Sequence, residues 1–138
     1  MGKVTARAST TVHADPDTVI GLLRDYGARP RILTDNYSAF RVEPGDVLSF
    51  HFAAGGRERD YRLVSELTGH RLTEKDELSS FTNVWEVTPA AGGSTVTLTG
   101  SWDGAGGIPG IFEGLFAPLG LKRIYAEVLT KLSAALPG

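Results

Sequence analysis

The first part of the chain alternates between apolar and polar residues. Val4, Ala6, Ala8, Thr10 and Val12 share one side of the segment, and charged or hydroxyl residues occupy most of the positions between them. A period of two with β-branched residues predicts a strand with one buried face, because successive side chains of a strand point to opposite sides. We therefore expect the segment 3–13 to form a strand.

A helix is predicted directly after this strand. Asp15 is a suitable N-cap, and Pro16 fits the first helical position. An apolar stripe with helical spacing follows, and Gly27 is placed to end the helix. We expect a helix over about 16–25 and a short second helix or turn over 28–33.

Between residues 37 and 102 the pattern is that of short strands separated by turns. Clusters of glycine, proline and serine mark the gaps, which are short enough for consecutive strands to pair as antiparallel hairpins. Parallel pairing would need long crossover connections, which this region lacks. We place the strands at about 37–43, 46–54, 60–67, 70–77, 81–89 and 94–102.

The alternation also predicts which side chains face inward. In three strands the apolar face is clear, whereas Tyr61 and Leu63 alternate with Arg62 and Val64, so the inner face of 60–67 stays open. The inward positions are Leu48, Phe50 and Phe52 in one strand, Phe81, Asn83, Trp85 and Val87 in another, and Val96, Leu98, Gly100 and Trp102 in the third.

The period becomes helical towards the C-terminus. Apolar residues recur at helical spacing from Leu121 onward, and Pro118 and Gly120 predict a kink or a broken first segment. We predict one α+β domain over 1–138, in which a seven-stranded curved antiparallel sheet wraps around the long C-terminal helix. One or two short helices lie between the first two strands.

This architecture would bring many large rings to one concave face. Gly100, Gly110 and Gly114 lie among them, so we expect a partly vacant apolar pocket instead of a solid core. The polar residues Tyr26, Arg29 and Asn83 would orient a ligand there. The residues predicted to line the pocket are Tyr26, Arg29, Leu33, Phe40, Phe50, Phe52, Tyr61, Asn83, Trp85, Leu98, Trp102, Phe112, Phe116, Ile124 and Val128.

A set of short motifs spreads over nearly the whole chain. The first strand runs into VHADPDTV at 12–19, LLRDY follows at 22–26, an Arg-Pro pair stands at 29–30, and GSTVTL at 93–98 precedes the C-terminal helix. This set resembles the Bet v 1-like, START-related superfamily (SRPBCC), most closely its bacterial polyketide cyclase/dehydrase and lipid-transport group. The family often has a tryptophan after that proline, where this chain has Arg-Ile-Leu. The resemblance implies a helix-grip fold with an apolar ligand cavity, and it implies no particular reaction.

Composition narrows the possible partners. The chain has 14 basic and 16 acidic residues and a net charge of −2, without the basic cluster typical of nucleic-acid binding. No stretch approaches the roughly 18 apolar residues of a membrane span, and the N-terminus shows no apolar leader pattern. The absence of cysteine excludes disulfides and thiol chemistry. We expect a cytoplasmic protein that binds a small hydrophobic ligand, with no nucleic-acid partner, no integral membrane association and a homodimer as one option.

Motifs for metal or cofactor binding are weak. His13, His51 and His70 share no ligand spacing, so we expect no metal. The glycine-rich segment 104–107 lacks the Lys-Ser/Thr pair of a phosphate loop and the parallel unit of a dinucleotide loop. We therefore expect no cofactor, and we interpret this segment as a strand-to-helix connection, which in the related fold lies beside the pocket entrance.

Three functions remain open. The first is a carrier that binds a lipid or polyketide-like molecule. The second is a polyketide cyclase or dehydratase that uses Asp103 or Tyr26 as the proton-transfer group. We prefer the interpretation of Asp103 as an ordinary turn aspartate. The third is a regulatory or toxin-like interaction protein, in which the helical segment 108–120 would mediate self-association.

Overall fold

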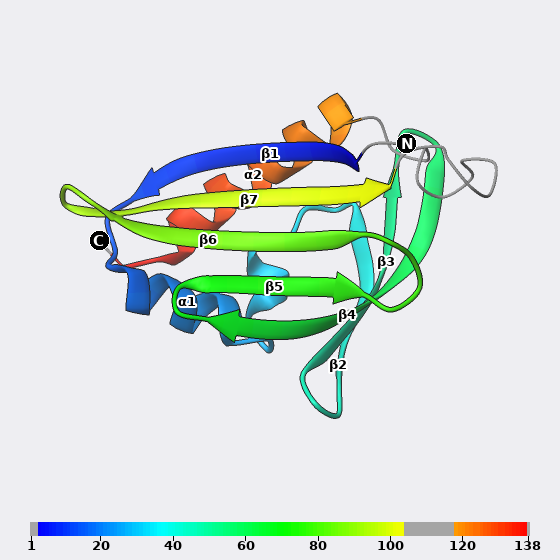
Figure 1. Ribbon diagram of the computed structural model, residues 1–138, viewed down its shortest axis with the longest axis horizontal. Helices are drawn as coiled ribbons and strands as arrows, with labels where there is room; N and C mark the ends of the chain where they lie inside the picture. Colours follow the sequence, from blue (N-terminus) through cyan, green and yellow to red (C-terminus); the bar gives the residue numbers. More distant parts are fainter. Residues whose placement is uncertain (1–2, 104–117, 138) are drawn as a thin grey trace.

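The computed structural model describes residues 3–103 and 118–137 (Figure 1). The seven strands are β1 (Lys3–Val12), β2 (Tyr37–Glu43), β3 (Val47–Ala54), β4 (Arg57–Thr68), β5 (Arg71–Asp76), β6 (Thr82–Ala90) and β7 (Gly93–Asp103). The helices are α1 (Pro16–Arg24), the short 3-10 helix η1 (Arg29–Ile32) and α2 (Pro118–Ala135).

The strands form one antiparallel sheet in the order β1-β7-β6-β5-β4-β3-β2. The first and last strands in the sequence pair with each other, with Lys3 opposite Asp103 and Val12 opposite Ser94. Figure 1 shows the sheet turning from β5, β6 and β7, which run across the view, to β3, which runs nearly at right angles to them. Such coiling gives the sheet a concave face, as the right-handed twist of strands predicts.

Helix α2 lies across the concave face behind β1 and β7 (Figure 1). Its buried residues are Leu121, Ile124, Tyr125, Val128, Leu129 and Leu132, and their spacing places them on one helical stripe. Helices α1 and η1 cover the same side of the sheet near the other end of α2. This arrangement confirms the predicted helix-grip fold, in which a curved sheet encloses a long C-terminal helix.

Helix α1 begins where the sequence predicted. The Asp15 carboxylate accepts a hydrogen bond from the Thr18 amide at 2.8 Å, and Pro16 occupies the first turn. This bond also lowers the pKa of Asp15, because it favours the charged carboxylate. The helix ends at Arg24, one residue before the predicted end.

The inward faces also follow the prediction. Phe50 and Phe52 of β3, Trp85 of β6, and Leu98 and Trp102 of β7 are all buried. The pattern of 60–67 left the inner face of that strand undecided. In the structure Tyr61 and Leu63 are buried, whereas Val64 is exposed. Strand β4 begins at Arg57 and not near residue 60, because the turn at Gly55 and Gly56 is tight enough for pairing to resume at once.

Two expectations about glycine were wrong. Gly120 lies within α2 without interrupting it. Gly100 does not leave a void, because a Cβ built there would lie 2.4 Å from the Tyr125 hydroxyl oxygen. The missing side chain at Gly100 instead makes room for the Tyr125 ring. Gly110, Gly114 and the expected break before Pro118 lie outside the described residues.

Candidate functional site

An apolar cavity opens between the sheet and the start of α2. We call it the outer cavity; the space between its walls, including the part open to solvent, is about 490 Å³. It lies at the end of the sheet where β7 finishes and β6 begins. Its lining residues are Tyr37, Phe50, Phe52, Arg59, Tyr61, Ser79, Phe81, Asn83, Trp102, Leu121 and Tyr125.

A second cavity lies deeper, towards η1. We call it the inner cavity; its space is about 320 Å³ on the same basis. Tyr37, Phe50 and Asn83 line both cavities, so the two cavities adjoin at these side chains. The lining residues of the inner cavity are Arg29, Leu33, Tyr37, Phe40, Leu48, Phe50, Leu63, Glu74, Asn83, Trp85, Leu98 and Val128.

Aromatic rings form a connected wall along the outer cavity. The ring centroids of Phe50 and Tyr61 are 5.4 Å apart, those of Tyr61 and Phe81 are 5.0 Å apart, and those of Phe81 and Trp102 are 6.3 Å apart. Rings at these separations attract one another beyond simple area burial. They therefore form a preorganised apolar surface.

A β-bulge brings β2 into this wall. The pairing of β2 with β3 shifts register between Ser38 and Arg41, and Ala39 has a positive φ of 52°. Tyr37 and Phe40 are three residues apart and would face opposite sides of a regular strand. Because the bulge reverses the alternation, both rings contact Phe50, with centroid distances of 5.3 Å and 6.3 Å.

A buried ion pair lies in the wall of the inner cavity. Arg29 Nη2 donates to Glu74 Oε2 at 2.8 Å and to the Leu23 carbonyl at 2.6 Å. The two charged side chains are 4% and 0% exposed, so neither reaches bulk water. The guanidinium also lies over the rings of Tyr26 and Trp85, at 5.4 Å and 5.3 Å from their centroids. Glu74 thus ties η1 and the C-terminal end of α1 to the centre of the sheet.

The second oxygen of Glu74 extends this network across β6. Glu74 Oε1 accepts from Trp85 Nε1 at 3.1 Å and lies 3.5 Å from Asn83 Nδ2. Asn83 Oδ1 in turn accepts from the Tyr125 hydroxyl at 2.6 Å. The chain of hydrogen bonds therefore runs from Arg29 to α2, and Gly100 provides the room that Tyr125 needs.

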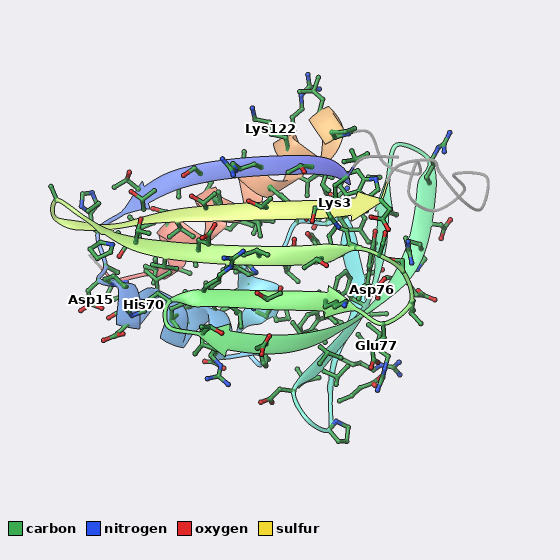
Figure 2. The ribbon with its side chains drawn as sticks, in the orientation of Figure 1. Lys3, Asp15, His70, Asp76, Glu77 and Lys122 are labelled. Atoms are coloured by element: carbon green, nitrogen blue, oxygen red, sulfur yellow. The ribbon has the colours of Figure 1, made fainter. Side chains whose placement is uncertain are left out.

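A second ion pair stands beside the outer cavity. Arg59 Nη2 lies 3.3 Å from Asp76 Oδ2, with side chains that are 9% and 0% exposed. Asp76 also accepts from Ser79 Oγ at 2.7 Å and from the Arg62 amide at 2.9 Å. The Arg59 guanidinium lies over the Tyr61 ring at 4.7 Å. Figure 2 shows Asp76 at the end of β5, far from His70 and Asp15 at the opposite end of the sheet.

Two tyrosines in the cavities are held neutral. Burial raises the pKa of Tyr37 above its ordinary value, and the nearby Tyr61 and Glu74 raise it further, whereas Arg29 opposes them. Burial likewise raises the pKa of Tyr125, with contributions from Tyr37, Tyr61 and Glu74. Both hydroxyls therefore keep their protons at neutral pH and act as hydrogen-bonding groups, not as bases.

The cavities contain most of the predicted ligand-binding residues. Eleven of them line the outer or the inner cavity: Arg29, Leu33, Phe40, Phe50, Phe52, Tyr61, Asn83, Trp85, Leu98, Trp102 and Val128. Tyr26 and Ile124 are buried in the core but line neither cavity. Phe112 and Phe116 lie outside the described residues, as do the segment 104–107 and most of 108–120.

The two catalytic candidates are not among the residues that line the outer or the inner cavity. Asp103 is the last residue of β7, opposite Lys3, and not the turn residue that we expected; its side chain is 64% exposed and pairs with Lys3 at 3.5 Å. The Tyr26 hydroxyl is buried and has no hydrogen-bond partner among the described residues.

Sequence reasoning missed the acidic half of each ion pair. Leu72, Glu74 and Asp76 share the buried face of β5, and the parity of that short strand was not assigned. Buried Leu72 is the signal that could have placed both carboxylates inside. Arg59, Ser79, Leu121, Tyr37 and Tyr125 were also absent from the predicted lining.

The described residues contain no group of three or more histidine, cysteine, aspartate or glutamate side chains able to hold a metal. His51 contacts Asp60 and Glu58, and His70 contacts Asp17, all on the outer surface. Within the described ranges, no helix is both long enough and apolar enough to cross a bilayer.

The fold and the ring-lined concavity define a helix-grip protein. A family model described as polyketide cyclase / dehydrase and lipid transport matches residues 3–137, and the chain belongs to this family. The solution structure of the KanY protein (ms6282) is 39% identical, with a TM-score of 0.88 and complete coverage of both chains. A search of curated proteins found no match.

Two more distant structures share the fold. Major latex-like protein 151 of Panax ginseng is 12% identical, with a TM-score of 0.73 and 99% coverage of both chains. The di-domain ARO/CYC StfQ from the steffimycin biosynthetic pathway is 15% identical, with a TM-score of 0.67; the match covers 96% of this chain and 50% of that one. At such identities the likeness concerns the fold alone.

Proposed function

We propose that this protein binds a small apolar or amphipathic molecule, lipid-like or polyketide-like, in the combined outer and inner cavities. The observation that carries the proposal is the pair of adjoining cavities with an aromatic wall and a few fixed polar groups. Pockets of this composition are the usual form of small-molecule sites. Burial of ligand hydrocarbon would supply most of the affinity, at roughly 25 cal/mol per Å² removed from water.

Trp102 provides the sharpest test of this proposal. It lines the outer cavity and its side chain makes no hydrogen bond to any other described residue, so Trp102→Phe should weaken ligand binding while the protein stays folded. Trp85 is less suitable, because its indole N–H supports Glu74 and its replacement would also cost stability. Val64→Ala, on the exposed face of β4, is the matched control.

The experiment is a thermal-shift screen with lipids and aromatic polyketides, preceded by native mass spectrometry of the freshly purified protein. We expect a co-purified adduct or a stabilising compound, with a smaller shift for Trp102→Phe and an unchanged shift for Val64→Ala. If no compound in either class stabilises the protein and no adduct appears, the proposed function is wrong.

A catalytic role is the second candidate, favoured by polar groups that face the outer cavity together. The Tyr125 hydroxyl and Asn83 lie 2.6 Å apart there, and Ser79 and Arg59 line the same space. Protonated hydroxyls and amides can stabilise a developing enolate oxygen. Loss of the mass of one water molecule from a bound β-hydroxy ketone, abolished in Tyr125→Phe, would support a dehydratase over a carrier.

A further inference from the structure

The charges around the combined cavity balance. Among the residues that the structure describes, the charged side chains in the cavity walls are Arg29, Glu74 and Arg59, and Asp76 is paired with Arg59. Each arginine has one buried carboxylate at hydrogen-bond distance, at 2.8 Å and 3.3 Å. The wall residues together with Asp76, which lies behind Arg59, therefore carry two positive and two negative charges, so neither arginine is left without a counter-charge.

This balance affects any anionic ligand. A carboxylate that enters the inner cavity loses its hydration and comes close to the Glu74 carboxylate, which is 0% exposed and paired with Arg29. Burial of a charge without a counter-ion is strongly unfavourable, and a like charge nearby makes it more so. Arg29 offers little compensation, because its Nη2 already donates to Glu74 and to the Leu23 carbonyl.

A neutral ligand that accepts hydrogen bonds would instead find donors without partners in this region. Arg29 Nε is buried and has no hydrogen-bond partner among the described residues, and Arg29 lines the inner cavity. Tyr37 lines both cavities and keeps its proton, so its hydroxyl is a second donor in the same region. Buried donors of this kind normally find a partner, which a ligand carbonyl oxygen could provide.

We propose that the cavity selects uncharged ligands that carry a carbonyl or similar acceptor, and that it rejects carboxylates of the same shape. The inference rests on the proposed function and deepens it by naming the chemical class of the ligand. The cavity would accordingly take a ketone, ester or related neutral molecule in preference to a free fatty acid or an aromatic acid.

The test uses three naphthalene probes of similar size: the methyl ketone, the carboxylate and the ethyl hydrocarbon. Affinities are measured at neutral pH by displacement of an environment-sensitive neutral dye. We expect the ketone to bind most tightly, the hydrocarbon more weakly and the carboxylate at least about tenfold more weakly than the ketone, since tenfold corresponds to only 1.4 kcal/mol. Equal or tighter binding of the carboxylate would overturn the inference while leaving the proposed function intact.

Charge variants separate electrostatic selection from shape. Glu74→Gln and Asp76→Asn each remove the negative charge of one ion pair, so the affinity of the carboxylate probe relative to that of the ketone should rise by several-fold or more. Asp60→Asn removes an exposed charge from the outer surface and is the matched control.

If both Glu74→Gln and Asp76→Asn fold, as circular dichroism would show, and neither improves carboxylate binding, the charge argument is wrong. The comparison of probes on the unmodified protein decides the question if neither variant folds. Failure of all three probes, together with failure of the lipid screen, would instead refute the proposed function.

Discussion

The two buried ion pairs each join an arginine to a carboxylate, but their surroundings differ. Arg29 and Glu74 lie in the wall of the inner cavity, where the carboxylate also meets the indole of Trp85 and the guanidinium is 4% exposed. Arg59 and Asp76 lie beside the outer cavity, whose space includes open solvent, and their carboxylate is held by a turn. The first pair joins three elements of the fold, whereas the second contributes only its arginine to a cavity lining.

The difference in surroundings determines how well each guanidinium could be hydrated if its carboxylate partner were lost. The Arg29 side chain is 4% exposed and lines the deeper cavity, so an unpaired guanidinium there would remain largely buried and uncompensated. Arg59 lines a cavity that is partly open, so its guanidinium can gain hydration through a change of side-chain conformation. Two pairs with similar burial should therefore differ in their contribution to stability.

The largest expected effect is the loss of the inner carboxylate. Glu74→Ala should lower the free energy of unfolding by about 3–5 kcal/mol, because it leaves a buried charge unpaired. Asp76→Ala should cost less, about 1–3 kcal/mol, mainly through lost hydrogen bonds. Urea unfolding followed by circular dichroism measures both values.

The paired replacement of Arg29 by Met and Glu74 by Leu is the control for this prediction. An apolar pair of similar volume removes both charges together, so it should recover much of the stability that Glu74→Ala loses. If Asp76→Ala proves as costly as Glu74→Ala, solvent access does not distinguish the two pairs.

A smaller effect is expected at Gly100, where the inner network meets α2. A Cβ at this position would approach the Tyr125 hydroxyl to 2.4 Å, so Gly100→Ala must displace the ring and break its bond to Asn83. We expect a loss of about 1–3 kcal/mol from overpacking and the unmade hydrogen bond.

The matched variant removes the hydroxyl that clashes. In a Tyr125→Phe background, the added cost of Gly100→Ala should be clearly smaller, because the closest atom is gone and the bond to Asn83 is already lost. A double-mutant cycle on unfolding free energies measures this coupling. Additive costs would show that Gly100 acts through the backbone and not through Tyr125.

The same two regions show what the sequence could predict. Strand parity, the Asp15 cap and the helical stripe of α2 follow from local patterns, and these decide most of the fold. Local pattern also placed Arg29 and Asn83 at the cavity. The partner of Arg29 is Glu74, 45 residues later on a short strand, and nothing local links the two.

The errors at the candidate site have the same origin. Gly100 was expected to leave space, but the Tyr125 ring of α2 occupies it. The sequence could not show this contact, because it depends on how the helix crosses the sheet. Tyr37 was missed because a bulge changes the alternation of β2, and the sequence of that strand shows no separate signal for it. Contacts between distant elements therefore account for what the sequence did not predict.

The smallest expected effect lies on the outer surface and contrasts with both interior pairs. Hydrogen bonds from Asp60 and Glu58 raise the pKa of His51, because both carboxylates favour the charged imidazole. A group whose pKa is raised on folding stabilises the protein fully below its unfolded value, near about 6.5, and loses this contribution as the pH rises through the folded value. The urea midpoint should therefore fall slightly between about pH 6 and about pH 8. The fall should be smaller in His51→Gln, which keeps a polar side chain without the titration. An equal pH dependence in the variant would mean that this surface cluster contributes nothing measurable, which is the usual result for an exposed ion pair.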